Sequence, residues 1–149
     1  MTSTQARTQL KRLLRRSPLA ALATSGPGGP HASLVACAVT AGEKEILFVT
    51  PRETRKYRNL LSEPRVALLF GDGRGGEDPL RRGLAVTALG RARELRGAAR
   101  KKMGVLLARR HPTLREFIED AGSALFCVKV TAYSVVGRFQ EVVEVRTRG

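Results

Sequence analysis

Three consecutive residues, Thr54, Arg55 and Lys56, bring a hydroxyl group and two positive charges to one point of the chain. An apolar, strand-like run at 46–49 precedes them, and a helix is expected to begin between the two features. The free backbone N–H groups at a helix N-terminus attract anions, and a hydroxyl group and two cations beside them suit a phosphate group. The alternative is a basic first turn that faces solvent, and for so short a string taken alone this alternative is the more common outcome.

The start of this helix has its own sequence signal. Thr50 can serve as the N-cap, Pro51 then occupies the first helical position, and Glu53 completes a capping box. The pattern predicts a helix that runs to about Ser62. Its apolar face is expected to consist of Tyr57, Leu60 and Leu61.

Length and composition fit a single domain over residues 1–149, in which 42% hydrophobic residues can form a core. The net charge of +14 favours anionic partners such as nucleic acid, anionic lipid or a phosphorylated ligand. An overall bias toward arginine also explains this charge, because the charged residues are scattered along the whole chain. Cys37 and Cys127 lie in apolar runs and are interpreted as reduced core residues. No run is long enough for a transmembrane helix, and a cytoplasmic location is the resulting interpretation.

Hydrophobic periodicity divides the chain into short strands, linked mostly by hairpins, and a few helices. Gly90 is expected to mark a bulge, and Gly137 to interrupt the last strand segment. Strands are expected at 19–25, 31–40, 45–50, 65–70, 83–94 and 124–132, and a last strand or hairpin at 133–145. Helices are expected at 4–16, 51–62, 97–109 and 113–121, and a Gly- and Asp-rich loop at 71–79. This pattern predicts a small antiparallel β-barrel with peripheral helices.

Several short motifs occur in an order that carries a family resemblance. They are LATS at 22–25, GGPHAS at 28–33, LFVT at 47–50, TRK at 54–56, NL at 59–60, PRVALL at 64–69, DPL at 78–80, GRA at 90–92 and RRHP at 109–112. Their order resembles that of the pyridoxamine 5′-phosphate oxidase-like, FMN-binding split-barrel family, in the branch near haem-utilisation proteins. The resemblance covers about residues 10–144. It implies a mainly β fold with peripheral helices, namely a six-stranded antiparallel Greek-key split β-barrel, and a homodimer with FMN at the subunit interface.

The resemblance also implies which residues hold the cofactor. Arg55 and Lys56 would bind the FMN phosphate, with help from Thr50 and Thr54. A dianionic phosphate needs several donors, so this assignment agrees with the chemistry of the residues and favours the phosphate site over its alternative. The further implied contacts are the strand segment Ser33, Leu34 and Val35 along the flavin, the pocket residues Phe48 and Val49, and, reaching across the dimer, Arg138 and Gln140. For the last two residues, outward-facing strand positions are an equally good interpretation.

Departures from the family pattern limit the implied activity. Pyridoxamine phosphate oxidases carry a C-terminal substrate motif with Arg and His, and haem-degrading relatives carry a haem-ligating histidine in an additional C-terminal region, but no histidine follows His111 here. Both specific activities are therefore disfavoured. His31 beside the flavin strand could donate a proton, although a solvent-facing histidine at a strand entry is the more common case. Two isolated histidines predict no metal site, and no Ser-His-Asp or Cys-His constellation supports hydrolysis.

Three functions follow from these residues and from the resemblance. The first is an FMN-dependent oxidoreductase with an unknown substrate, in which the flavin carries the redox step and no general acid or base is assigned. The second is a non-enzymatic flavin- or haem-binding module that shares the site without turnover. The third and least favoured is a nucleic-acid-binding protein, because the aromatic residues look like core residues and not like stacking partners for bases. FMN is the expected cofactor, with a deazaflavin or haem as alternatives.

Overall fold

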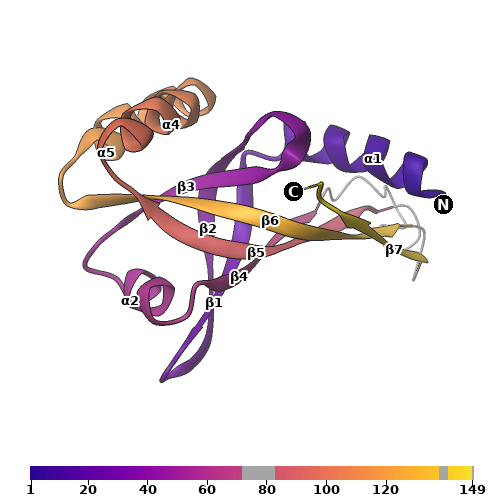
Figure 1. The fold of residues 1–149 in the computed structure, drawn as a ribbon, viewed down its shortest axis with the longest axis horizontal. Coiled ribbons are helices and arrows are strands. Elements are labelled where there is room, and N and C mark those ends of the chain that lie inside the picture. The colour runs from indigo at the N-terminus through magenta and orange to yellow at the C-terminus, as the bar shows by residue number, and fades with distance from the viewer. Residues whose placement is uncertain (72–82, 138–140, 149) are drawn as a thin grey trace.

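The computed structural model describes residues 1–71, 83–137 and 141–148. Seven strands in these ranges form one antiparallel sheet in the order β3-β2-β1-β4-β5-β6-β7, and a pairing between β3 and β6 closes six of them into a barrel (Figure 1). The strands are β1 (Leu19–Gly26), β2 (Gly29–Val39), β3 (Glu45–Pro51), β4 (Arg65–Gly71), β5 (Ala85–Leu95), β6 (Ser123–Gly137) and β7 (Glu141–Arg146). The predicted six-stranded antiparallel barrel is confirmed. The loop expected at 71–79 lies, apart from its first residue, outside the described residues.

The barrel strands alternate between a buried inner face and an outer face. In β4, Val66, Leu68 and Phe70 are buried in the main core, whereas Leu69 between them is 50% exposed. The same alternation in the other strands fills the barrel interior with apolar side chains. It also leaves apolar side chains on the outside, where only helices or another molecule can cover them.

One irregularity lies between β5 and β6. The register shifts between Leu89 and Gly90, with Thr131 of β6 as the extra residue, so the bulge predicted at Gly90 is confirmed. A Cβ atom at Gly90 would lie 2.3 Å from the carbonyl oxygen of Lys129. This close approach of two strands explains why the position is glycine.

β6 is longer than the sequence predicted. The boundary expected at Tyr133 is wrong, because this residue lies buried within β6 and its hydroxyl donates a hydrogen bond to the carbonyl oxygen of Glu43 at 2.9 Å. The strand ends at Gly137, the position where an interruption was expected, and β7 begins at Glu141.

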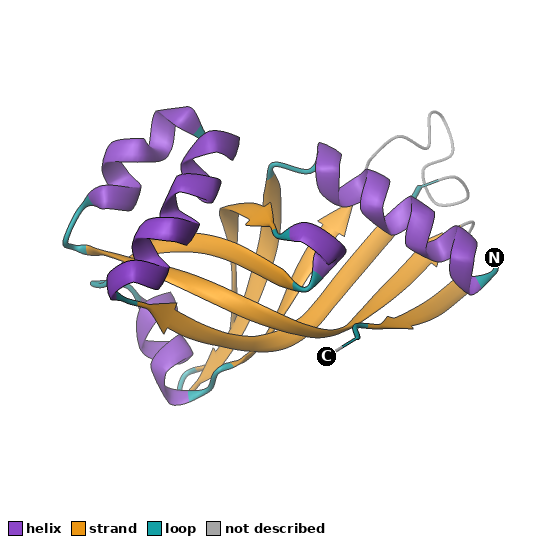
Figure 2. Ribbon diagram, turned by 45° about the horizontal axis from the view of Figure 1, so that its top comes forward, coloured by secondary structure: helices purple, strands orange, loops and turns teal. Residues whose placement is uncertain are grey.

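Helix α1 (Ser3–Arg16) lies across the barrel at the end where β7 is found (Figure 2). Thr2 and Gln5 form a capping box at its N-terminus. Its buried face consists of Ala6, Leu10, Leu13 and Leu14. The helix predicted at 4–16 is therefore confirmed, and its basic residues face outward.

A second helical layer covers the outer side of β2, β3 and β6. It consists of α4 (Gly97–Arg110), a short 3-10 turn η2 (Pro112–Leu114) and α5 (Arg115–Glu119). The predicted helix at 97–109 and the break at His111 are confirmed, whereas the helix expected at 113–121 is shorter and is preceded by the 3-10 turn. The layer shares a second apolar cluster with the strands, formed by Ala38, Leu47, Val49, Leu95, Leu107, Ile118, Leu125 and Cys127. None of the helices in the described ranges has the length and apolarity to cross a bilayer.

Both cysteines are buried and carry free thiols, as predicted. Burial raises the pKa of Cys37 to about 12, and it has the same effect on Cys127, whose pKa is also about 12. The thiols are therefore neutral and unreactive at pH 7.

Helix α2 (Arg55–Ser62) begins later than predicted, because its N-cap is Thr54 and not Thr50. The Thr54 hydroxyl oxygen accepts a hydrogen bond from the backbone N–H of Tyr57 at 3.1 Å. Thr50 cannot cap the helix, because it still belongs to β3 and pairs with Ala124 of β6. The expected apolar face is correct for Tyr57 and Leu60 but wrong for Leu61, which is 61% exposed.

Candidate functional site

The connection from β3 to α2 places two hydroxyl groups beside the first turn of the helix. Thr50 is fully buried, and its Oγ1 lies 3.4 Å from Oγ1 of Thr54. Thr54 in turn donates a hydrogen bond to the carbonyl oxygen of Pro51 at 2.9 Å. These bonds fix the chain just before α2, so the start of the helix has a defined position at the end of β3.

Two cations extend from this helix start. Nη2 of Arg55 donates a hydrogen bond to the carbonyl oxygen of Gly28 at 3.0 Å, which ties α2 to the turn between β1 and β2. Lys56 is half-buried, and desolvation by burial lowers its pKa. No ion pair engages either residue within the described ranges. A partly desolvated ammonium group without a counter-charge is a favourable partner for an anion.

The strand segment predicted to run along the flavin alternates as a strand must. Val35 is buried in the barrel core, and Leu34 is 72% exposed on the outer side. Ser33 lies on the same inward face as Val35 and also as His31. Oγ of Ser33 and Nδ1 of His31 are buried without a hydrogen-bond partner in the described structure.

The end of the barrel that holds these two atoms is the end that α2 covers. His31 pairs in register with Thr24, whose hydroxyl oxygen accepts a hydrogen bond from Nδ2 of Asn59 in α2 at 3.2 Å. Leaving a buried polar atom without a partner costs about 1–3 kcal/mol. The Ser33 and His31 atoms are therefore unpaired polar groups inside this end of the barrel.

Phe48 and Val49 lie on opposite faces of β3. The Phe48 ring stacks on Phe126 inside the barrel, with ring centroids 5.5 Å apart, whereas Val49 belongs to the outer cluster under α4 and α5. The two side chains therefore do not line one pocket within this chain, because neighbouring strand residues point to opposite sides. Their contacts with a cofactor stay a prediction. Arg138 and Gln140 lie outside the described residues.

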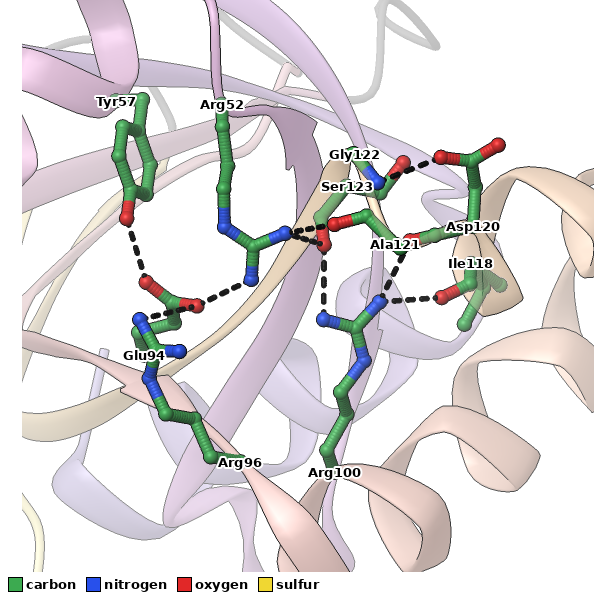
Figure 3. Close-up of polar contacts among 10 residues, drawn as sticks. All are labelled: Arg52, Tyr57, Glu94, Arg96, Arg100, Ile118, Asp120, Ala121, Gly122 and Ser123. Atoms are coloured by element: carbon green, nitrogen blue, oxygen red, sulfur yellow. Dashed lines mark hydrogen bonds and ion pairs between the residues drawn. The ribbon is translucent and has the colours of Figure 1, made fainter.

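Sequence reasoning missed a polar network beside the helix start (Figure 3). Glu94 of β5 accepts hydrogen bonds from Nη2 of Arg52 at 2.7 Å and from the Tyr57 hydroxyl at 2.8 Å, and Nη2 of Arg96 lies 3.2 Å away. Burial alone would raise the pKa of Glu94, but the bonds from Arg52 and Tyr57 and the charges of both arginines lower it below its ordinary value. Hydrogen bonding to Glu94 raises the pKa of Arg52. The pair is thus fully ionised at pH 7.

The network continues to the segment between α5 and β6. The backbone N–H of Arg52 bonds to the carbonyl oxygen of Gly122 at 2.9 Å, and its guanidinium donates to Ala121 and, at 2.9 Å, to Ser123. Arg100 of α4 donates to the same Ser123 oxygen at 2.8 Å (Figure 3). Arg52, which leads into α2, is thereby fastened to β5 and to the start of β6, and Arg100 of α4 binds the same Ser123 oxygen.

One signal in the sequence could have pointed to this network. Glu94 is the only acidic residue between Asp78 and Glu116, and it stands among several arginines. A lone carboxylate in so basic a stretch is a natural partner for buried or half-buried cations. Its partner Arg52 lies 42 positions earlier in the chain, so only the fold brings the two together.

Comparison with known proteins agrees with this architecture. The family model described as pyridoxamine 5′-phosphate oxidase matches residues 6–137. A search of curated protein sequences finds no match.

Solved structures with the same fold share little sequence with this chain. A heme binding protein from Mycobacterium smegmatis has 20% identity and a TM-score of 0.81, over 97% of this chain and 57% of that one. A general stress protein 26-related protein of the pyridoxinephosphate oxidase family from Clostridium acetobutylicum has 16% identity and a TM-score of 0.73, over 98% and 96% of the two chains. An FAD-binding protein from Mesorhizobium loti has 17% identity and a TM-score of 0.69, over 86% and 91%. The chain thus spans little more than half of the Mycobacterium protein, and by its family match it belongs to the pyridoxamine 5′-phosphate oxidase family.

Proposed function

We propose that this protein binds FMN at the start of α2 and acts as a flavin-dependent oxidoreductase. The observation that carries the proposal is the convergence of Thr50, Thr54, Arg55 and Lys56 at one helix N-terminus. The backbone N–H groups of Arg55 and Lys56 precede the first intrahelical bond, which runs from the N–H of Arg58 to the carbonyl oxygen of Thr54 at 3.2 Å. Such groups, with two cations beside them, suit a terminal phosphate.

The residues present fit the rest of a flavin nucleotide. Ser33 lies on the inward face of β2, opposite to Leu34, so a contact of its side chain with the cofactor stays a prediction. The outer side of β2 offers apolar surface, because Leu34 is 72% exposed. When bound, FMN supplies the redox chemistry, and the chain supplies binding, orientation and charge. The FAD-binding structural neighbour supports a flavin, and the heme binding neighbour makes haem the second candidate ligand.

A homodimer with the cofactor at the subunit interface is part of this proposal. Leu34 of β2 and Leu69 of β4 both pair in register with Ala21 of β1, so the three form one row across the outside of the barrel. Leu69 is 50% exposed and Leu89 nearby on β5 is 45% exposed. A continuous apolar row of this kind typically marks an interface, and it adjoins the strand that would run along the flavin.

The first test is the visible absorption spectrum of the purified protein, followed by titration with FMN and measurement of the quenching of flavin fluorescence. Each charged hydrogen bond to phosphate contributes about 1.5–3 kcal/mol, so replacing Arg55 and Lys56 by alanine should weaken FMN binding by at least about a hundredfold. Arg58→Ala is the matched control, because it removes an exposed cation from the next turn of the same helix. Its FMN affinity should stay within about threefold of the wild type.

The outcomes separate the candidate functions. Flavin bands that are reduced by NADH or NADPH in the presence of a substrate support the oxidoreductase, whereas tightly bound flavin without turnover across a substrate panel supports a binding module. A Soret band without FMN uptake would assign the protein to haem. If the folded double variant kept wild-type affinity for FMN, the phosphate would bind elsewhere and the proposal would be wrong.

A further inference from the structure

A second site lies between the two helices of the outer layer. A groove of about 970 Å³ runs between α4 and the η2–α5 segment, which lie side by side at one end of the molecule (Figures 1 and 2). Among the residues assigned above to FMN, those that the structure describes do not line this groove. A volume near 1,000 Å³ is at the upper end of what small-molecule sites offer, roughly 300–1,000 Å³.

The floor of the groove is apolar. It is formed by Gly104, Val105 and Ala108 of α4 together with Pro112 and Ile118. Gly104 lets the two helices approach closely, because a Cβ atom there would lie 3.4 Å from Cγ2 of Ile118. Val105 is 53% exposed, so the packing of the helices leaves apolar surface uncovered along the groove.

The rim of the groove is cationic. The guanidinium group of Arg100 donates hydrogen bonds to three carbonyl oxygens, those of Ile118, Asp120 and Ser123. Arg115 forms an ion pair with Glu119 at 3.7 Å. The two other cations, Lys101 and Arg109, also line the groove. Neither of these two forms an ion pair in the part of the chain that the structure describes.

Lys101, Val105 and Arg109 follow one another at intervals of four residues and therefore share one face of α4. At a rise of 1.5 Å per residue the two cations are separated by about 12 Å along the helix, with the exposed valine between them. Among the described residues that line the groove, Glu119 is the only carboxylate, and it is already paired with Arg115. The groove therefore presents unbalanced positive charge beside an apolar surface. That combination is complementary to a ligand with an apolar body and an anionic end.

We propose that this groove binds a single-chain amphiphilic carboxylate, with the chain along the apolar floor and the carboxylate on Arg109. The guanidinium group of Arg109 matches a carboxylate bidentately, which a lysine cannot do. The cation at Lys101 adds attraction at the other end of the groove. The proposal concerns a site other than the start of α2, because none of the described lining residues is one assigned to FMN.

Isothermal titration of the full-length protein with dodecanoate, below its micelle concentration, tests the proposal. Dodecyltrimethylammonium has the same chain with a cationic head, and acetate has the head without the chain. Both should bind at least about tenfold more weakly than dodecanoate, because each lacks one of the two complementary parts. Arg109→Gln should weaken dodecanoate binding by roughly tenfold or more, which is the loss of one charged hydrogen-bonding partner.

Lys102→Gln is the matched control, because it removes a unit charge from an exposed position of α4 that does not line the groove. Its affinity for dodecanoate should equal that of the wild type. Ala108→Phe should fill the groove and abolish binding, and Val105→Glu, at an exposed position, should repel the carboxylate without disturbing the fold. If Ala108→Phe does not fold, the affinity of Val105→Glu for dodecanoate tests the proposal.

Three results would overturn the proposal. One is equal loss of affinity in Lys102→Gln and Arg109→Gln, which would indicate unspecific attraction to the overall positive charge. Another is equally tight binding of the cationic amphiphile. The third is failure of the folded wild-type protein to bind dodecanoate.

Discussion

Replacing Glu94 by glutamine is the sharpest test of how the candidate FMN site is held in place. Glutamine keeps the shape of the side chain and an oxygen that can still accept the bond from Tyr57, but it removes the charge that Arg52 and Arg96 face. The Glu94 side chain is only 7% exposed, and that of Arg52 is 27% exposed, so water compensates little for the loss.

The expected loss in the free energy of unfolding follows from the individual contacts of Glu94. The bond between Arg52 and Glu94, at 2.7 Å, joins two charged groups and is expected to contribute about 1.5–3 kcal/mol. The Arg96 side chain is 72% exposed, so its ion pair adds only about 0–1 kcal/mol. We therefore expect Glu94→Gln to lower the free energy of unfolding at pH 7 by about 2–4 kcal/mol, or the melting temperature by roughly 5–12 °C for a chain of this size.

Urea unfolding followed by circular dichroism measures this change, and Glu119→Gln is its matched control. Glu119 pairs with Arg115 at 3.7 Å, but their side chains are 70% and 74% exposed, so the same substitution there should cost no more than about 0.5 kcal/mol. If the two substitutions were equally mild, the buried network would not stabilise the fold as argued.

The pH dependence gives a second readout. The folded-state pKa of Glu94 is lower than its ordinary value of 4.5, so its contribution is fully present above that value and is lost as the pH falls toward the folded-state pKa. Glutamine does not titrate. The difference in stability between wild type and Glu94→Gln should therefore be constant above about pH 5.5 and should shrink below pH 4.5. A difference that stayed constant down to about pH 3 would refute the reasoning.

Further predictions concern the cofactor, the dimer and the bulge. Burial lowers the pKa of Lys56, so its ammonium group should lose its proton at a lower pH than a free lysine does. As the pH rises from about 7 to 10, FMN affinity measured by fluorescence should therefore begin to fall earlier in the wild type than in Lys56→Arg, whose guanidinium stays charged. Coincident pH profiles would contradict the assignment of Lys56 to the phosphate. Leu69→Glu should convert the proposed dimer to a monomer in size-exclusion chromatography with light scattering, whereas Leu61→Glu, at an even more exposed position on α2, should not. Gly90→Ala should lower the free energy of unfolding by about 1–3 kcal/mol, because its Cβ would meet a backbone oxygen. At Gly71, an added Cβ would meet no atom of another described residue beyond its chain neighbours within 4 Å, so Gly71→Ala should change the free energy of unfolding by less than about 0.5 kcal/mol; similar effects would argue against the close approach at Gly90.

Much of the barrel could be predicted from the sequence, because strand periodicity is recorded in neighbouring residues. The apolar run at 65–70 predicted β4 and its position, and Gly90 marked the bulge before any partner strand was known. The boundary predicted within β6 was wrong because a bulged strand breaks the simple alternation near Thr131, although the strand itself continues.

The candidate site was only partly predictable for the same reason. The sequence alone determined that a hydroxyl group and two cations would stand at a helix start after a strand, since those residues are adjacent in the chain. Only the tertiary structure decided that Thr54 caps the helix, because pairing with β6 holds Thr50 in the sheet. It likewise decided that Glu94 holds Arg52, because the two residues are 42 positions apart in the chain. The groove beside α4 also depends on tertiary structure, because it forms only where α4 packs against the η2–α5 segment.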